Sequence, residues 1–265
     1  KINLGLNILL RRQDGFHEIE SVFYPIPWRD ILEIVPEKSG KGSASITSSG
    51  VEIPSDGKAN LCEQVYQLMH EEFNLPSVKM HLHKIIPIGA GLGGGSADAA
   101  FTVTMLNELF NLKLTDDKLE QVVASVGSDC PFFIKNKAAY VTGRGEVLDS
   151  FELNLSGCWM LLVNPNIHIG TADAYAGVRI GQPEVSLKEV LKKPTSEWKG
   201  AVTNGFENSV FAKYPVLSEL KDQFYRMGAS YASMTGSGST VFGIFETQPQ
   251  LTVFSEEYSV KVVQL

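Results

Sequence analysis

Hydrophobic and polar residues alternate along much of the first third of the chain, a pattern typical of β-strands. Residues 1–10 carry isoleucine and leucine at every second position from Ile2. The pair Asp14-Gly15 predicts a hairpin turn after this strand, and residues 21–37 read as further strand. The beginning of the chain is therefore expected to form antiparallel β-structure.

The spacing of hydrophobic residues changes near Asn60 to three and four positions, which predicts a helix. Asn60 and Glu63 match the pattern of a capping box at its start. Alternation returns in residues 77–84, and a glycine-rich stretch follows. This order predicts a strand, a loop and then a helix from about Ser96 to Leu109.

The remaining chain mixes both periods. We expect a helix within residues 114–127 with Thr115 as its N-cap, and a hairpin within residues 138–151. A buried strand is expected from Cys158, helices around residues 172–178, 186–192 and 215–227, and a strand-turn-strand at residues 232–245. Strands and helices intermix without regular βαβ alternation, which favours the α+β class. A boundary near residues 154–157 predicts two domains, 1–155 and 156–265.

Composition narrows the class of protein. With 265 residues, 43% of them hydrophobic, the chain can bury a large core. Its formal charge of −7 argues against a nucleic-acid partner. No apolar run approaches the ~20 residues of a membrane span, and the first residues do not resemble a signal peptide. Cys62, Cys130 and Cys158 are odd in number and widely spaced, as reduced thiols would be. We therefore expect a cytoplasmic protein.

The stretch PIGAGLGGGSADAA, residues 87–100, concentrates backbone freedom directly before a helix. It contains G-x-G-x-x-G, but Pro87 interrupts the lead-in strand and no acidic residue ends a second strand, as a dinucleotide fold requires. A P-loop is also excluded, because no lysine follows the glycines before Ser96. Exposed N–H groups at a helix start suit phosphates. A tight turn packed against a neighbouring strand remains the alternative.

Three ordered motifs give the chain a specific resemblance. The glycine loop resembles the P-x-x-x-G-L-G-(small)-S-(small)-A-A signature of the GHMP small-molecule kinases, and MTGSGST, residues 234–240, resembles their C-terminal glycine turn. KINLGLNILLRRQDGFHEIESVF, the three glycines 93–95 and VGSDCPFF are similar to one branch, which phosphorylates the 2-hydroxyl of 4-(cytidine 5'-diphospho)-2-C-methyl-D-erythritol in the non-mevalonate isoprenoid pathway. The resemblance implies a two-domain α+β GHMP kinase fold. Its N-terminal half would be like ribosomal protein S5 domain 2, and its C-terminal half ferredoxin-like.

The resemblance also implies a catalytic apparatus. Asp129 would be the general base for the acceptor hydroxyl and Lys1 its partner, which suits phosphoryl transfer. The resemblance assigns the phosphates of ATP, accompanied by Mg²⁺, to the loop residues Pro87, Ile88, Gly89, Ala90, Gly91, Leu92, Gly93, Gly94, Gly95, Ser96 and Ala97. It does not identify the magnesium ligands.

The acceptor carries a cytidine diphosphate, so its site should offer a flat aromatic surface. Phe16 and His17 are the candidates after the D-G turn, and Tyr175 is the candidate for the opposite face of the base. Asn3 would bind the sugar-alcohol portion, and Gly236 and Ser237 would cover the reacting phosphate or the acceptor diphosphate. The alternatives are a sister kinase acting on homoserine, mevalonate or a sugar, a non-catalytic ATP sensor and, more distantly, a redox enzyme. A monomer or a weak homodimer is expected.

Overall fold

The computed structural model describes residues 1–37, 42–54, 57, 59–178, 180–251 and 254–265. The chain forms two compact units, each assembled from separate stretches of sequence. The first unit comprises Lys1–Trp28, Gly89–Leu92 and Ala138–Leu265, and the second comprises Arg29–Ile88 and Gly93–Lys137. These units are defined by their compactness in space, whereas the predicted domains 1–155 and 156–265 are continuous stretches of sequence. The predicted domain boundary therefore stays a prediction.

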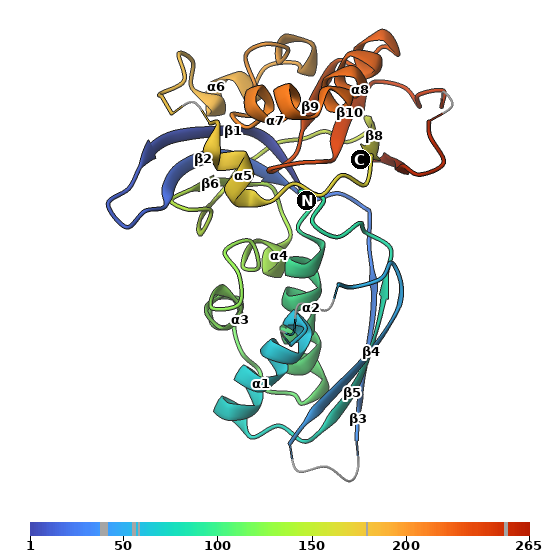
Figure 1. Ribbon diagram of the computed structural model, residues 1–265. Helices are drawn as coiled ribbons and strands as arrows, with labels where there is room; N and C mark the ends of the chain where they lie inside the picture. Colours follow the sequence, from blue (N-terminus) through green and yellow to red (C-terminus); the bar gives the residue numbers. More distant parts are fainter. Residues whose placement is uncertain (38–41, 55–56, 58, 179, 252–253) are drawn as a thin grey trace. The chain divides into compact units, whose positions relative to one another are not determined.

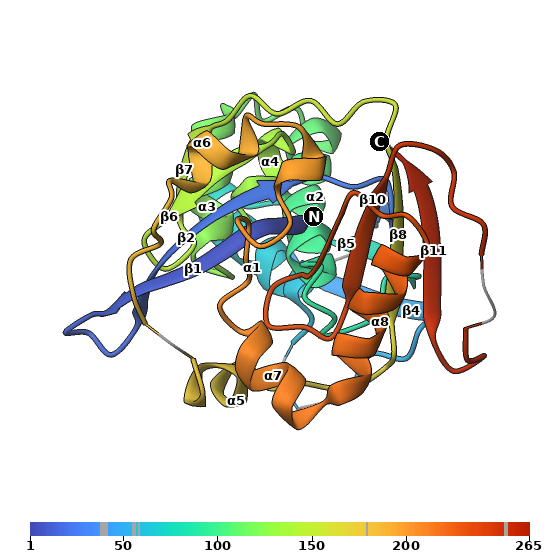
Figure 2. The same cartoon turned by 90° about the horizontal axis from the view of Figure 1, so that it is seen from above.

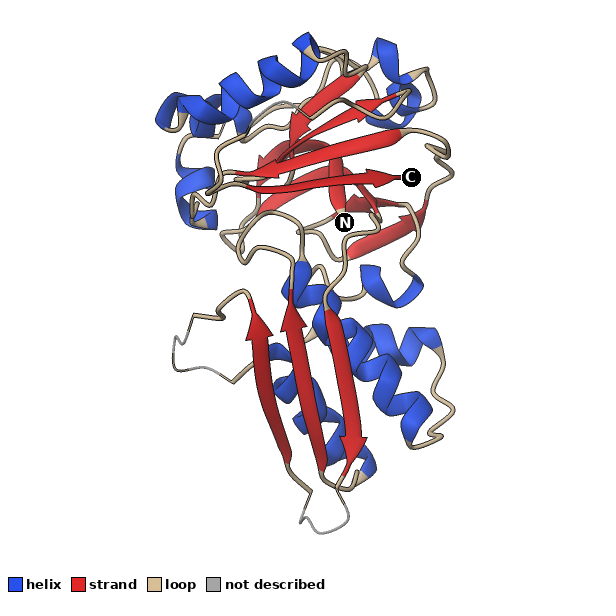
Figure 3. Ribbon diagram, turned by 90° about the vertical axis from the view of Figure 1, so that its right-hand side faces the viewer, coloured by secondary structure: helices blue, strands red, loops and turns tan. Residues whose placement is uncertain are grey.

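The second unit is a three-stranded sheet with helices on one face (Figure 1, Figure 3). The order of its strands is β3-β5-β4, with β3 antiparallel and β4 parallel to the central strand. Its elements are β3 (Ile31–Pro36), β4 (Ala44–Gly50), β5 (Val78–Lys84), α1 (Leu61–Phe73), α2 (Gly94–Leu109), α3 (Asp116–Ala124) and α4 (Phe132–Lys135). Apolar side chains of β5 alternate into the core beneath α1 and α2, as the sequence pattern predicts.

The first unit contains two four-stranded antiparallel sheets (Figure 2). One has the order β1-β2-β6-β7, and the other has the order β11-β8-β10-β9. Their strands are β1 (Ile2–Arg11), β2 (His17–Tyr24), β6 (Ala139–Thr142), β7 (Val147–Ser150), β8 (Trp159–Asn164), β9 (Tyr231–Met234), β10 (Val241–Phe245) and β11 (Ser259–Gln264).

Short helices accompany these sheets: α5 (Thr171–Ala176), α6 (Leu187–Leu191), a 3-10 turn (Thr195–Glu197), α7 (Glu207–Lys213) and α8 (Pro215–Arg226). Helix α8 packs on β9 and β10, and one apolar cluster joins this helix to β1, β2 and β8. No helix of the described residues combines the length and the apolar character needed to span a membrane.

The α+β class is confirmed, and several local predictions hold. Asn60 accepts a hydrogen bond from the backbone N–H of Cys62, Glu63 completes the capping box of α1, and Thr115 caps α3. The hairpin of β6 and β7 lies where the sequence predicts it.

Other local predictions were wrong or incomplete. Residues 21–37 are not one strand, because the prolines at positions 25 and 27 interrupt it and the two parts join different sheets. Helix α2 begins at Gly94, two residues before the expected start. Strand β4 was missed because its residues are mainly polar, and α4, α7 and β11 were also missed.

Candidate active site

The glycine loop alternates left-handed and ordinary backbone conformations before α2. Gly89, Gly91 and Gly93 have φ values of 65°, 76° and 71°, which side-chain-bearing residues rarely adopt. Helix α2 then begins at Gly94, and no side chain of the described residues caps its start. The first N–H groups of a helix lack intrahelical partners and lie at its positive end. This geometry suits an anion such as a phosphate.

The first half of the loop packs against the second glycine motif within the first unit. A Cβ atom on Gly91 would lie 2.1 Å from the Thr235 carbonyl oxygen. The Thr235 hydroxyl donates to the Gly91 carbonyl at 3.2 Å, and the Thr240 N–H donates to the Ala90 carbonyl at 3.3 Å. Two motifs that are distant in sequence are therefore adjacent in the fold.

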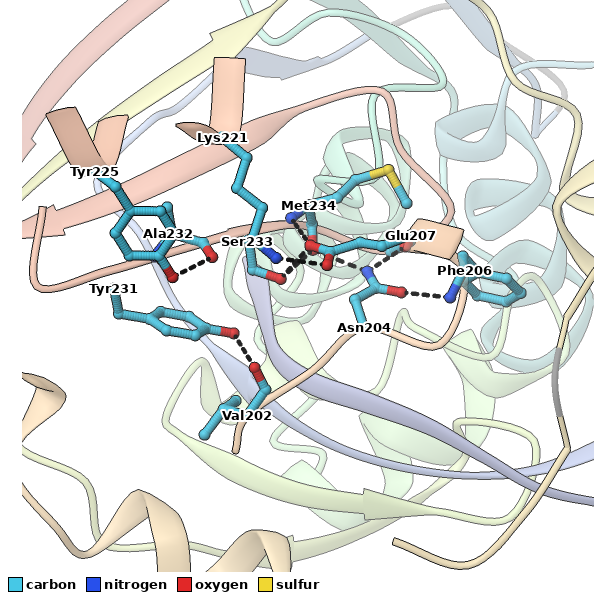
Figure 4. A network of polar contacts seen from close by, with 11 residues as sticks. Val202, Asn204, Phe206, Glu207, Lys221, Tyr225, Tyr231, Ala232, Ser233 and Met234 are labelled. Atoms are coloured by element: carbon cyan, nitrogen blue, oxygen red, sulfur yellow. Dashed lines mark hydrogen bonds and ion pairs between the residues drawn. The ribbon is translucent and has the colours of Figure 1, made fainter. Parts of the chain in front are cut away.

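Two buried polar residues anchor the strand and turn that carry this second motif (Figure 4). The Asn204 side chain donates to the carbonyls of Met234 and Gly236 at 2.8 and 2.9 Å. The Glu207 carboxylate accepts from the Ser233 hydroxyl at 2.9 Å and from the Met234 N–H at 2.8 Å. Sequence reasoning missed both residues, because they lie in and just after an irregular segment without a recognisable motif.

The start of β1 joins the same part of the first unit. The Lys1 ammonium donates to the Asn3 side-chain oxygen at 2.8 Å, and the Asn3 amide donates to the Ser21 hydroxyl at 3.0 Å. The Asn3 N–H donates to the Thr235 hydroxyl at 3.0 Å, and the Lys1 backbone nitrogen donates to the Leu92 carbonyl at 3.1 Å. Both side chains are buried. The structure thus brings the predicted residues Lys1 and Asn3 together with the first half of the loop and the turn.

The second unit brings the start of α2 together with the turn that contains Asp129. The Cys130 thiol forms a hydrogen bond with the Ser96 hydroxyl, and burial raises the pKa of this thiol to about 11. The Cys130 N–H donates to the Gly127 carbonyl at 3.1 Å, which closes the turn between α3 and α4. Asp129 is half-buried in this turn, next in sequence to the residue that contacts Ser96.

A buried ion cluster lies at the junction of β5 and α2. The Lys84 ammonium lies 2.5 Å from an oxygen of Asp30 and 2.8 Å from an oxygen of Asp98. The second oxygen of Asp30 accepts from the N–H groups of Ile85 and Ile86 at 2.6 and 2.9 Å. Burial raises the pKa of Asp98 to about 6, against the opposing effect of Lys84. The cluster fixes the end of β5, where the chain enters the glycine loop, to the N-terminal part of α2.

Sequence reasoning missed this cluster, although the sequence contains a signal for it. Lys84 follows Val78, Met80 and Leu82 in steps of two, so it falls on the buried face of β5. A lysine on a buried face requires a carboxylate partner. Asp98, near the start of the following helix, is such a partner.

The predicted aromatic residues are distributed over two contacts in the first unit. The rings of His17 and Tyr175 stack on each other, with their centroids 4.5 Å apart and their planes 16° apart. Tyr175 also contacts the ring of Phe206 edge-on at 4.8 Å. The Phe16 side chain is exposed and contacts the Arg144 guanidinium at 4.8 Å. The Tyr175 ring therefore lies directly against His17, whereas the sequence analysis expected it on the opposite face of the base.

The side chains that the structure describes are not arranged as a metal site. Within the described residues, no group of three or more His, Cys, Asp or Glu side chains is arranged to hold a metal ion. Mg²⁺ in nucleotide sites keeps several waters and is held mainly by phosphate oxygens. The residues present therefore fit a magnesium ion that arrives with a nucleotide. Ser96, at the helix start, is the one residue of the loop 87–97 with a side-chain oxygen and so its candidate ligand.

Comparison with known proteins identifies the family of the chain. The model of the GHMP kinases N terminal domain matches residues 60–137, and that of the GHMP kinases C terminal domain matches residues 186–258. Two curated proteins named 4-diphosphocytidyl-2-C-methyl-D-erythritol kinase are similar over nearly the whole chain. The protein from Cytophaga hutchinsonii is 51% identical, covering 94% of this chain and 92% of its own, and that from Bacteroides fragilis is 48% identical, covering 95% and 92%.

A crystal structure of a 4-(cytidine 5'-diphospho)-2C-methyl-D-erythritol kinase matches with a TM-score of 0.76 and 30% identity, covering 92% of this chain and 87% of that one. The fold and the loop define a small-molecule kinase. The chain belongs to the GHMP kinases and, within them, to the family of these curated relatives.

Proposed function

We propose that the protein is an ATP-dependent kinase that phosphorylates the 2-hydroxyl of 4-(cytidine 5'-diphospho)-2-C-methyl-D-erythritol, with Asp129 as general base. The contact between Ser96 and Cys130 carries this proposal. It joins the uncapped start of α2, which suits phosphates, to the turn that holds Asp129. A phosphate-binding element and a carboxylate in one compact unit are what phosphoryl transfer to an alcohol needs.

The proposed chemistry divides between the loop and two side chains. The loop N–H groups and the positive end of α2 hold the ATP phosphates, while bound Mg²⁺ would neutralise part of their charge. The Asp129 carboxylate accepts the proton of the attacking hydroxyl. The Lys1 ammonium stabilises negative charge on the transferred group. Burial and the hydrogen bond to Asn3 support this role, because they hold the ammonium in one orientation.

The acceptor assignment uses the aromatic contacts of the first unit. The cytosine would stack on the exposed ring of Phe16 and bond to His17, while Tyr175 supports His17 from behind. This modifies the original expectation that Tyr175 takes the opposite face of the base, since its ring lies against His17. Asn3 would contact the sugar-alcohol portion, and Gly236 and Ser237 the diphosphate.

The free thiols of the three cysteines support a cytoplasmic location.

A sister kinase is the nearest alternative. Solved structures of a homoserine kinase and a mevalonate kinase share the fold at 15% and 14% identity. Those acceptors carry no base to stack. A panel of acceptors tests the assignment: ADP release should be stimulated by the cytidylyl acceptor and not by homoserine or mevalonate. Stimulation by either of the latter would contradict the proposed acceptor, and ATP binding without any stimulated release would indicate a sensor.

The role of Asp129 is tested separately. Asp129→Asn should lower the turnover number by about 10² to 10⁴ while ATP affinity changes little, because the carboxamide cannot accept the proton. Asp117→Asn is the matched control, since Asp117 lies in the same unit with a side chain that is 84% exposed. Unchanged turnover in Asp129→Asn would refute the role as base.

A further inference from the structure

The turn between β6 and β7 presents one residue that the proposed mechanism does not use. The Arg144 guanidinium carbon lies 4.8 Å from the centroid of the Phe16 ring. This distance is within the range in which a guanidinium is attracted to an aromatic face. Phe16 itself is 54% exposed, so the guanidinium provides a specific contact for a ring that otherwise extends into solvent.

The position of Arg144 is fixed by its surroundings. The guanidinium of Arg144 lies 3.4 Å from a Glu146 oxygen, and the backbone N–H of Arg144 donates to the same carboxylate. The turn is tied to β2 on both sides of Gly143, whose N–H donates to Glu18 at 2.9 Å and whose carbonyl accepts from the Ile19 N–H at 2.8 Å. The β6–β7 turn therefore aims Arg144 at the tip of the neighbouring hairpin.

The tip of that hairpin is held in a complementary way. The Asp14 carboxylate accepts from the Phe16 N–H at 3.1 Å and pairs with Arg12 at 3.1 Å. Desolvation by itself would raise the pKa of Asp14. The hydrogen bond from the Phe16 N–H and the contact with Arg12 outweigh this effect, so the pKa is lowered. The backbone of Phe16 is thus fixed by Asp14, and its ring is fixed by Arg144.

We propose that Arg144 is a positioning residue for the base of the acceptor. Resting on the proposed function, the inference is that the guanidinium covers one face of the Phe16 ring and leaves the other face oriented for the cytosine. Ordering a side chain during binding weakens affinity, and a ring that is already ordered avoids this loss. Arginine suits the role better than lysine, because its planar group stacks on a ring.

Steady-state kinetics with the cytidylyl acceptor test this proposal. Arg144→Gln should raise the acceptor KM by about threefold to tenfold, while kcat and the KM for ATP change less than about twofold. Arg144→Lys retains the charge without the planar stack and should raise the acceptor KM to a similar extent. Arg226→Gln, which removes an exposed guanidinium from the end of α8, is the control and should change neither KM.

A double-mutant cycle with Phe16→Leu separates positioning from a general structural effect. Arg144→Gln should have no further effect on the acceptor KM once the ring is absent. Four results would overturn the proposal. In Arg144→Gln these are an unchanged acceptor KM or equal increases in the KM values for acceptor and ATP. The other two are independent effects of the substitutions at Arg144 and Phe16, and a native acceptor KM in Arg144→Lys. If the native protein releases no ADP with this acceptor, the proposed function fails, and the inference fails with it. If the native protein is active but the effects of Arg144→Gln and Phe16→Leu are not coupled, the role of Arg144 is refuted while the proposed function stands.

Discussion

Gly91 and Thr235 approach so closely that no side chain fits between their backbones. A Cβ atom on Gly91 would lie 2.1 Å from the Thr235 carbonyl oxygen and 3.1 Å from that of Gly238. The φ value of 76° at Gly91 is itself unfavourable for any other residue. The glycine at this position is therefore required twice, once by conformation and once by the packing of the loop on the second glycine turn.

Gly91→Ala should destabilise the protein by about 2 to 5 kcal/mol, because the left-handed conformation and the overlap with a backbone atom both contribute. Urea unfolding followed by circular dichroism measures this loss. Gly157→Ala is the matched control: its φ value is 87°, but no atom lies within 4 Å of the added Cβ. The control should lose only about 1 to 2 kcal/mol. Equal losses in the two variants would show that the contact with Thr235 is not tight.

Features of this region that depend on residues close together in the sequence could be predicted, and contacts between residues far apart in the sequence could not. The glycine loop, its following helix and the Asn60 cap are local features, and local patterns identified them. The contact between Gly91 and Thr235 joins residues 144 positions apart in the sequence, and only the resemblance predicted a shared site for the two motifs. Glu207 and Asn204 act through backbone groups of a distant strand and turn, which leave no pattern in their own neighbourhood.

Charge at the base of the loop gives a prediction for the pH dependence of stability. Asp98 and Asp30 share one ammonium, and Asp30 also receives two backbone N–H groups, so Asp98 is the less compensated carboxylate. Its pKa is raised to about 6 by burial. The folded state then binds the proton more tightly than the unfolded state, so this group lowers stability as the pH rises from about 4 to about 6.

Asp98→Asn removes this titration with little change in shape. The free energy of unfolding of the variant minus that of the native protein should therefore increase as the pH rises from 4 to 7, because only the native protein loses this contribution. Urea titrations at a series of pH values measure the difference. A change in the opposite direction would show that Lys84 lowers the pKa of Asp98 more than burial raises it.

The three thiols should differ in reactivity. Burial raises the pKa of Cys62 to about 12 and that of Cys130 to about 11, and both side chains are inaccessible. The thiolate is the reactive form, so these two residues should not react in the folded protein at pH 8. Cys158 is partly exposed. Ellman's reagent should therefore modify one thiol in the native protein and three after unfolding, and Cys158→Ser should abolish the native reaction. A second native thiol would indicate that one of the buried sites opens.

The start of α1 offers a test of local stability that is independent of any ligand. Asn60 accepts from the Cys62 N–H at 2.9 Å, and Glu63 accepts from the Asn60 N–H at 3.1 Å. Asn60→Ala removes the first bond and leaves an N–H group of the helix start without its acceptor, so unfolding should become easier by about 0.5 to 2 kcal/mol. Asn60→Asp should retain stability, because its carboxylate accepts the same bond and favours the positive helix end. Glu63→Gln should also retain it, since glutamine completes a capping box equally well. Thermal and urea unfolding of the three variants measure these effects, and a loss in Asn60→Asp as large as that in Asn60→Ala would mean that the amide group of Asn60 makes an essential contact other than the cap.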